Sequence, residues 1–215
     1  MTDEEPASAV PRQRDAERSQ KLILDAAVQE FAAHGLAGAR VERIAERAGL
    51  AKRLIFYYFD NKDSLFRAVL HETYRSIREA EKLLRLTDLS PIDGIRRLVE
   101  FTWTYYLEHP EFLTLLNSEN LHRARHLAGS PDIQDVNFPL IRTLEEILER
   151  GRKEGVFRGG VDPVQLYISI AGLAYFYLSN NATLSVVFAR DLMATKALNE
   201  RLSHITEVIL GYVVR

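Results

Sequence analysis

The chain has 215 residues, 47% of them hydrophobic and 27% charged, as expected of a globular protein that buries a core. It contains no cysteine, which excludes disulfides, thiolate metal sites and cysteine nucleophiles. The net charge is only −2, but residues 12–67 hold 11 basic and 8 acidic side chains while the rest hold 17 and 22, so we expect an anionic partner at the N-terminal end.

The first third of the chain predicts three helical segments after a polar start, and the last two of them are short. Residues 1–14 have few large apolar side chains and are predicted to form a flexible arm with a basic end. Apolar residues then recur at helical spacing over 15–34, and Gly35 is expected to end that helix. A short amphipathic helix is predicted over 41–48 and another over 51–58.

Gly49 lies between the last two of these helices and permits the positive φ of a tight turn. The pattern is a helix-turn-helix, whose second helix enters the major groove of DNA. Cations suit phosphates and guanine edges, and tyrosine hydroxyls suit phosphate oxygens. The predicted DNA contacts are therefore Arg40, Arg43, Lys52, Arg53, Tyr57, Tyr58 and Lys62, with a solvated surface position as the alternative for Arg43.

The remaining sequence predicts six further helices and no strand. Asn61 is a good N-cap for a long helix that reaches about Leu86. Further helices are predicted from Pro91 to Glu108, 110–127, 132 to the loop GRKEGVFRGG, 163–179 and 190–214, with Pro139 expected to kink or delay the third of them. The prediction is an all-α chain of nine helices, divided into an arm (1–14), a helix-turn-helix domain (15–60) and a helical body (61–215).

Two of these helices carry apolar surfaces suited to a partner subunit. The segment 163–179 is apolar almost all round, and 190–214 has apolar residues at alternating spacings of three and four, as in a coiled coil. The longest apolar stretch has 15 residues and is interrupted by Gln165, too short for a membrane span of about 20 residues. A helix that is apolar on both sides is either central in the core or shared between the core and a partner. In the second case we expect a homodimer with the interface residues Leu166, Ile170, Leu173, Tyr177, Leu198, Leu202, Ile205 and Ile209, and we expect the protein to be cytoplasmic.

Two other functions are weighed against DNA binding. Glu119, His122 and His126 share a predicted helix face, which raises the alternative of a metal site, although a solvated polar face explains the same spacing and no metal or cofactor is predicted. Glu119 with His122 is also the best catalytic pair, but no phosphate loop, paired carboxylates or cofactor fingerprint accompanies it, so we do not predict an enzyme. A helical docking module that does not bind DNA is the remaining alternative.

Residues 20–67 resemble the DNA-binding domain of the tetracycline-repressor (TetR) family of transcription regulators. The family frame runs F-x-x-x-G, I-A-x-x-A-G, Y-x-Y-F and K-x-x-L, and here these are Phe31 to Gly35, Ile44 to Gly49, Phe56 to Phe59, and Lys62 to Leu65. The chain departs from the frame at Ala39 and Ala51, where the family has hydroxyl residues, and at Phe56, where it commonly has tyrosine.

The resemblance implies a body that binds a small-molecule effector and dimerises through a four-helix bundle made by the last two helices of each subunit. A two-fold dimer implies a near-palindromic double-stranded DNA operator. The implied function is a repressor that a small molecule releases, with activation as an open alternative. The implied pocket residues are Trp103, Tyr106, Asn117, Asn120, His122, Tyr167, Tyr175 and Phe176, with Trp103 and Asn120 preferred. Core packing without a ligand is the alternative for most of them.

Overall fold

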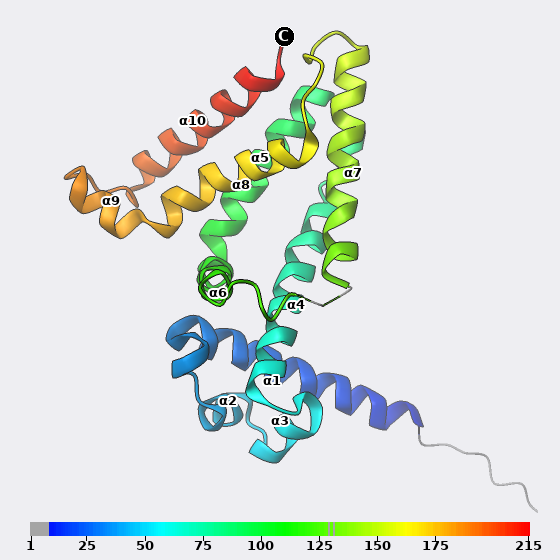
Figure 1. The fold of residues 1–215 in the computed structure, drawn as a ribbon, viewed down its shortest axis with the longest axis vertical. Coiled ribbons are helices and arrows are strands. Elements are labelled where there is room, and N and C mark those ends of the chain that lie inside the picture. The colour runs from blue at the N-terminus through cyan, green and yellow to red at the C-terminus, as the bar shows by residue number, and fades with distance from the viewer. Residues whose placement is uncertain (1–8, 129, 131) are drawn as a thin grey trace, which may run out of the picture. The chain divides into compact units, whose positions relative to one another are not determined.

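In the computed structural model, residues 9–128, 130 and 132–215 are described, and this part of the chain forms ten α-helices, one 3-10 helix and no strand (Figure 1). The predicted all-α fold is therefore confirmed, with one helix more than the nine expected. The elements are α1 (Ala9–Gly38), α2 (Val41–Ala48), α3 (Lys52–Phe59), α4 (Lys62–Lys82), η1 (Leu86–Asp88), α5 (Pro91–Glu108), α6 (Pro110–Leu121), α7 (Asp132–Lys153), α8 (Pro163–Ser179), α9 (Asn181–Val187) and α10 (Thr195–Val213).

The chain divides into two compact units. The first unit comprises Met1–Glu72 and Thr114–Gly129, and the second comprises Thr73–Leu113 and Ser130–Arg215. Helices α4 and α6 each contribute residues to both units. Residues 1–8 of the predicted arm lie outside the described residues, and α1 already begins at Ala9.

The first unit packs α1 to α4 around one hydrophobic core. Phe31 of α1 and Phe66 of α4 are both fully buried, and their rings meet edge to face with centroids 5.0 Å apart. Burying a side chain of this size stabilises a fold by about 1.5–3 kcal/mol. The backbone of Gly35 leaves helical geometry (φ 63°, ψ 175°), as expected, and Leu36 and Ala39 beyond it return to the same core.

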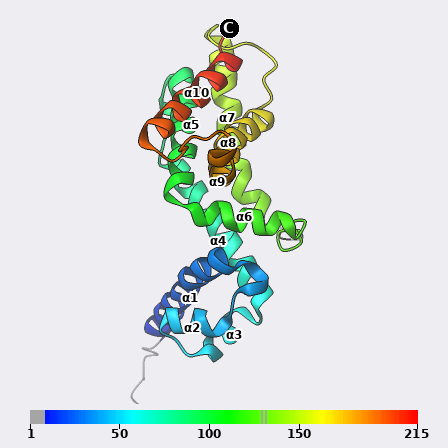
Figure 2. The same cartoon turned by 90° about the vertical axis from the view of Figure 1, so that its left-hand side faces the viewer.

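In the second unit α5 contacts α7, α8 and α10 (Figures 1 and 2). Ser90 begins α5 by accepting a hydrogen bond from the Asp93 N–H (3.2 Å), and Asp162 begins α8 by accepting one from the Gln165 N–H (2.8 Å). Both starts were predicted from a capping residue followed by proline. Gly151 in α7 is required sterically, because a Cβ there would lie 2.2 Å from the Phe157 ring.

Several helix boundaries differ from the predicted ones. Helix α4 ends at Lys82, and Arg85 takes a left-handed conformation (φ 49°) that leads into η1. Helix α6 ends at Leu121 and not near Leu127, because Arg123 and Ala124 both have φ 56°. The segment predicted to join two helices at 180–190 forms α9, and α7 continues through Pro139 from a start at Asp132. None of the described helices is long and apolar enough to cross a membrane.

Candidate functional site

The turn between α2 and α3 is fixed at Gly49, which has a left-handed conformation (φ 66°, ψ 29°). Its N–H donates to the Glu46 carbonyl at 3.1 Å, and the Leu50 N–H donates to the Ala45 carbonyl at 3.1 Å. These bonds close the end of α2, as glycine C-caps do. The predicted helix-turn-helix is confirmed, with its turn at the expected residue.

Helix α3 is anchored by Ile55, which is 1% exposed, and presents a mixed cationic and aromatic surface to solvent. Lys52, Arg53, Phe56 and Tyr57 are all exposed, and their spacing of one and four residues places them on one face. Tyr57 is 79% exposed and packs its ring edge to face with the partly buried Tyr58 at 5.1 Å. A large exposed tyrosine beside cations is suited to contact with nucleic acid.

The two cations at the start of α3, Lys52 and Arg53, differ in their ion-pair contacts. Lys52 Nζ lies 2.5 Å from Glu42 Oε1, in a pair whose side chains are 48% and 65% exposed. Such a surface pair is worth at most about 1 kcal/mol, so a phosphate can replace the carboxylate. Within the described residues the guanidinium of Arg53 has no ion-pair partner, so it is available to an external anion.

Glu30, which is 1% exposed, ties α1 to α2. Its Oε1 accepts hydrogen bonds from the Arg40 N–H (2.9 Å) and from Arg43 Nε (2.7 Å). Burial acts to raise the pKa of Glu30, but the bonds from Arg43 and the Arg40 N–H outweigh it and hold the pKa below its ordinary value. Arg43 also donates to the Gly38 carbonyl (3.1 Å), so its side chain is used inside the unit.

Lys62 is likewise engaged within the first unit. Its Nζ lies 3.3 Å from the Ala39 carbonyl and 3.5 Å from the Ala37 carbonyl, which joins the start of α4 to the end of α1. Of the seven predicted DNA contacts, Lys52, Arg53, Tyr57 and Tyr58 lie on α3, and the Arg40 side chain is exposed just before α2.

Residues 114–128, which were predicted to belong to the helical body, belong to the first unit. Glu119 (1% exposed) holds His126 through Oε2 and Nδ1 at 2.6 Å, and its Oε1 accepts the His126 and Leu127 N–H groups at 2.8 and 3.1 Å. The His126 ring meets Phe66 edge to face at 5.1 Å, and Leu115 joins the same core. No local pattern indicated this packing.

The same geometry bears on the metal and catalytic alternatives. The helix face that was to carry Glu119, His122 and His126 does not form, because α6 ends at Leu121. Both Glu119 oxygens are engaged by His126 and the neighbouring backbone. Among the described residues no group of three or more His, Asp or Glu is arranged to hold a metal ion.

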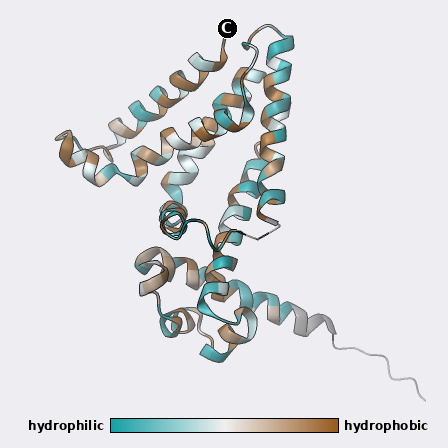
Figure 3. Ribbon diagram, in the orientation of Figure 1, coloured by the Kyte–Doolittle hydropathy of each residue, from teal (hydrophilic) through white to brown (hydrophobic). Residues whose placement is uncertain are grey.

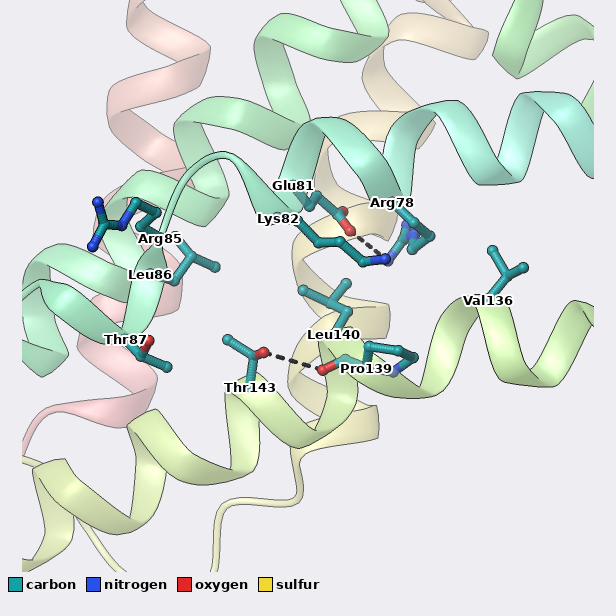
Figure 4. A pocket seen from close by; sticks show the side chains of 10 residues that line it. All are labelled: Arg78, Glu81, Lys82, Arg85, Leu86, Thr87, Val136, Pro139, Leu140 and Thr143. Carbon is teal, nitrogen blue, oxygen red and sulfur yellow. Dashed lines mark hydrogen bonds and ion pairs between the residues drawn. The ribbon is translucent and has the colours of Figure 1, made fainter.

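The second unit contains a cavity of about 170 Å³ between the C-terminal end of α4, η1 and α7 (Figure 4). In Figure 4 the side chains of Arg78, Glu81 and Lys82 extend from α4 toward α7, whose Leu140 and Thr143 face them. Arg78 and Glu81 are 4% and 5% exposed, an unusual degree of burial for two charged residues.

Tyr167 of α8 fixes the buried arginine. Arg78 Nη2 donates to the Tyr167 hydroxyl at 2.6 Å, and Arg78 Nη1 pairs with Glu81 Oε2 at 2.9 Å. Burial raises the pKa of Glu81 to about 7, although the Arg78 charge acts to lower it. Burial also raises the pKa of Tyr106, whose hydroxyl is electrostatically coupled to Arg78 and Tyr167.

The predicted pocket residues are not gathered around this cavity. Trp103 is buried against Tyr177 with ring centroids 5.7 Å apart, and Phe176 is 58% exposed. The structure assigns Asn117, Asn120 and His122 to the first unit, and Asn120 is exposed. Tyr106 and Tyr167 interact electrostatically with the buried Arg78, and Tyr175 is partly buried in α8. Sequence reasoning missed Arg78 and Glu81, because two charged residues in a helix otherwise indicate a solvated face.

Helices α8 and α10 pack together, and both carry hydrophobic residues along their length (Figure 3). Some of these apolar side chains are exposed to solvent. Leu166, Ile170, Ile205 and Ile209, predicted for the interface, are at most 2% exposed within this one chain. Leu173, Tyr177, Leu198 and Leu202 are partly buried. The exposed apolar side chains of these two helices include other residues: Val164, Ile168, Phe176, Val208 and Tyr212, each between 42% and 58% exposed.

Known protein families match both the N-terminal and the C-terminal part of the sequence. Residues 23–69 match the family described as bacterial regulatory proteins, tetR family, and residues 91–209 match the tetracyclin repressor-like C-terminal domain. The HTH-type transcriptional repressor NicS of Pseudomonas putida is 39% identical over 199 residues, which cover 93% of this chain and 94% of that protein.

Solved structures agree with the fold. A TetR family transcription regulator from Marinobacter aquaeolei has a TM-score of 0.70 and 22% sequence identity, and the match covers 94% of this chain and 98% of that one. The structure of AibR in complex with isovaleryl coenzyme A and operator DNA has a TM-score of 0.67 and 16% identity, with coverages of 90% and 99%.

Proposed function

This chain belongs to the TetR family of bacterial regulatory proteins, and we propose that it represses transcription by binding a near-palindromic operator as a homodimer, which a small-molecule effector then releases. A relative called a transcriptional repressor at 39% identity over nearly the whole length of both chains supports repression over activation. The proposal places the protein in the cytoplasm with its DNA and involves no cofactor.

The observation that carries DNA binding is the exposed surface of α3. A core-anchored helix follows a glycine turn and presents Lys52, Arg53 and Tyr57 together to solvent. Arg53 without an ion-pair partner, beside Tyr57 that is 79% exposed, favours a nucleic-acid surface over a protein-docking surface. We assign Arg53 and Tyr57 the principal contacts with DNA, and Lys52, Tyr58 and Arg40 supporting ones.

The helix-turn-helix needs its surroundings held rigidly if α3 is to fit a groove. Arg43 and Lys62 supply that support through Glu30 and the Ala39 carbonyl. We therefore propose that these two residues position the interface. Their removal is expected to weaken operator binding by loosening the unit.

The dimer is proposed to form through the exposed face of α8 and α10. Ile168, Phe176, Val208 and Tyr212 provide apolar area there, and the exposed Gly172 lies between them. Contiguous apolar surface of this kind marks interaction sites on soluble proteins. A two-fold axis through this face repeats the α3 surface, so two half-sites about one DNA turn or more apart are expected.

Effector release is proposed to act through α4. This helix begins with Lys62 beside the helix-turn-helix and ends with Arg78, Glu81 and Lys82 in the cavity of the second unit. A ligand that binds one arrangement of α4 better than another shifts the population toward it. The ratio of the ligand affinities of the two states sets the largest change in operator affinity that the ligand can cause.

The test is a titration of the purified full chain against DNA from upstream of its own gene at two salt concentrations. An Arg53→Ala/Tyr57→Ala double variant is compared with the parent, and Arg97→Ala, an exposed arginine in the second unit, is the matched control. We expect palindrome-dependent binding by the parent and the control, with loss in a double variant that still unfolds at the parent temperature. Equal binding by the double variant would refute the assignment of α3, and no selective binding to upstream or genome-wide selected DNA would refute the function.

A further inference from the structure

We propose that the cavity between α4, η1 and α7 is the effector site and that it takes a small organic monocarboxylate about the size of one six-membered ring. This inference rests on the proposed function and adds the chemical class of the ligand. The cavity volume is about 170 Å³. An apolar cavity of about 150 Å³ accommodates benzene, so one substituted ring fills the space.

Two residues that line the cavity carry polar atoms without a hydrogen-bond partner among the described residues. These atoms are Arg78 Nε and both Glu81 carboxylate oxygens, although both side chains are at least 95% buried and Oε2 lies 2.9 Å from Arg78 Nη1 as an ion pair. Unsatisfied buried polar groups are rare in folded proteins, and a bound water, ion or ligand is the usual reason for them. Tyr167 holds the guanidinium in place, so the donor is already oriented for a ligand.

The charges around the cavity favour an anion. Arg78, Lys82 and Arg85 line it together with a single carboxylate, that of Glu81. Arg85 is paired with Asp88 at the exposed end, whereas Lys82 has no ion-pair partner among the described residues. Cationic groups at a recess with low-dielectric walls raise the local concentration of anions.

The opposite wall is suited to a ring. Helix α7 contributes Val136, Pro139, Leu140 and Thr143, none of which is charged (Figure 4). A ligand with its ring on α7 and its carboxylate toward Arg78 and Lys82 satisfies both walls. A carboxylate beside Glu81 requires that residue to be protonated, and burial already brings its pKa to about 7, so the neutral form is accessible at neutral pH.

The test is calorimetric titration of the full chain with three ring-sized probes that differ in charge: benzoate, neutral benzamide and cationic benzylamine. We expect benzoate to bind at least tenfold more tightly than either of the others. We also expect it to lower the affinity of the protein for its operator in the same preparation. Benzoate, 3-hydroxybenzoate and cyclohexanecarboxylate all failing to bind at 10 mM would overturn the inference, and so would tighter binding of benzylamine.

Variants locate the binding and separate it from folding. Lys82→Met, at an exposed position, is expected to weaken benzoate binding by threefold to tenfold, and Arg78→Met to abolish it. Glu81→Gln, which resembles the protonated side chain, is expected to keep it. Arg97→Met, an exposed arginine of the same unit, is the control and should bind like the parent. Unchanged affinity in both Lys82→Met and Arg78→Met would place the ligand elsewhere, and operator binding that persists in these preparations shows that only this inference has failed.

Discussion

Replacing Arg43 by alanine distinguishes a DNA contact from a structural role. The change removes both short bonds to Glu30 (Nε at 2.7 Å and Nη2 at 2.6 Å) and leaves a carboxylate that is 1% exposed with only the Arg40 N–H and the distant His34 ring, at 3.8 Å. Breaking a fully buried ion pair costs about 3–5 kcal/mol. Because the Arg43 side chain is 39% exposed, we expect a smaller loss of unfolding free energy, about 2 kcal/mol.

The assay is urea unfolding followed by far-ultraviolet circular dichroism, because the single tryptophan, Trp103, lies in the second unit and does not report on the first. Hydrogen exchange of the α1 and α2 amides then localises the effect. Arg47→Ala, an exposed arginine of the same helix, is the control and should stay within about 0.5 kcal/mol of the parent. A parent-like Arg43→Ala that nevertheless loses operator affinity would refute the structural role and support a direct phosphate contact.

Three further predictions concern the second unit. Glu81→Gln should remove a pH dependence of the free energy of unfolding. In the parent, the raised pKa of Glu81, about 7, contributes stability that is fully present below pH 4.5 and is lost as the pH rises through 7. The stability of the variant relative to the parent should therefore rise by up to about 3 kcal/mol between pH 5 and 8, and parallel stability profiles would contradict this. Gly151→Ala should destabilise by about 1–3 kcal/mol because its Cβ would meet the Phe157 ring, while Gly159→Ala, with no atom nearer than 4.0 Å, should not; equal melting temperatures would disprove the steric argument. Ile168→Asp should convert the proposed dimer to a monomer in analytical ultracentrifugation, and Leu83→Asp, an exposed leucine on another helix end, should not; an intact Ile168→Asp dimer would place the interface elsewhere.

The helix-turn-helix was predictable because its signals are local. The glycine at position 49, the apolar spacing of α2 and the cations of α3 all act within a few residues, and each has a direct conformational consequence. The capped starts at Ser90 and Asp162 were read in the same way. Helix ends at Lys82 and Leu121 were missed, because apolar residues continue past them and the left-handed residues there are not glycine.

By itself the sequence determined the all-α class, the position of the turn, the exposed surface of α3 and the resemblance to a family of regulators. Only the tertiary structure decided which charged residues serve the fold and which remain available. Arg43 meets Glu30 across 13 residues, Lys62 reaches the Ala39 carbonyl across 23, and Tyr167 approaches Arg78 across 89. Periodicity assigns a residue to a face of its own helix, but it carries no information on what another helix places against that face.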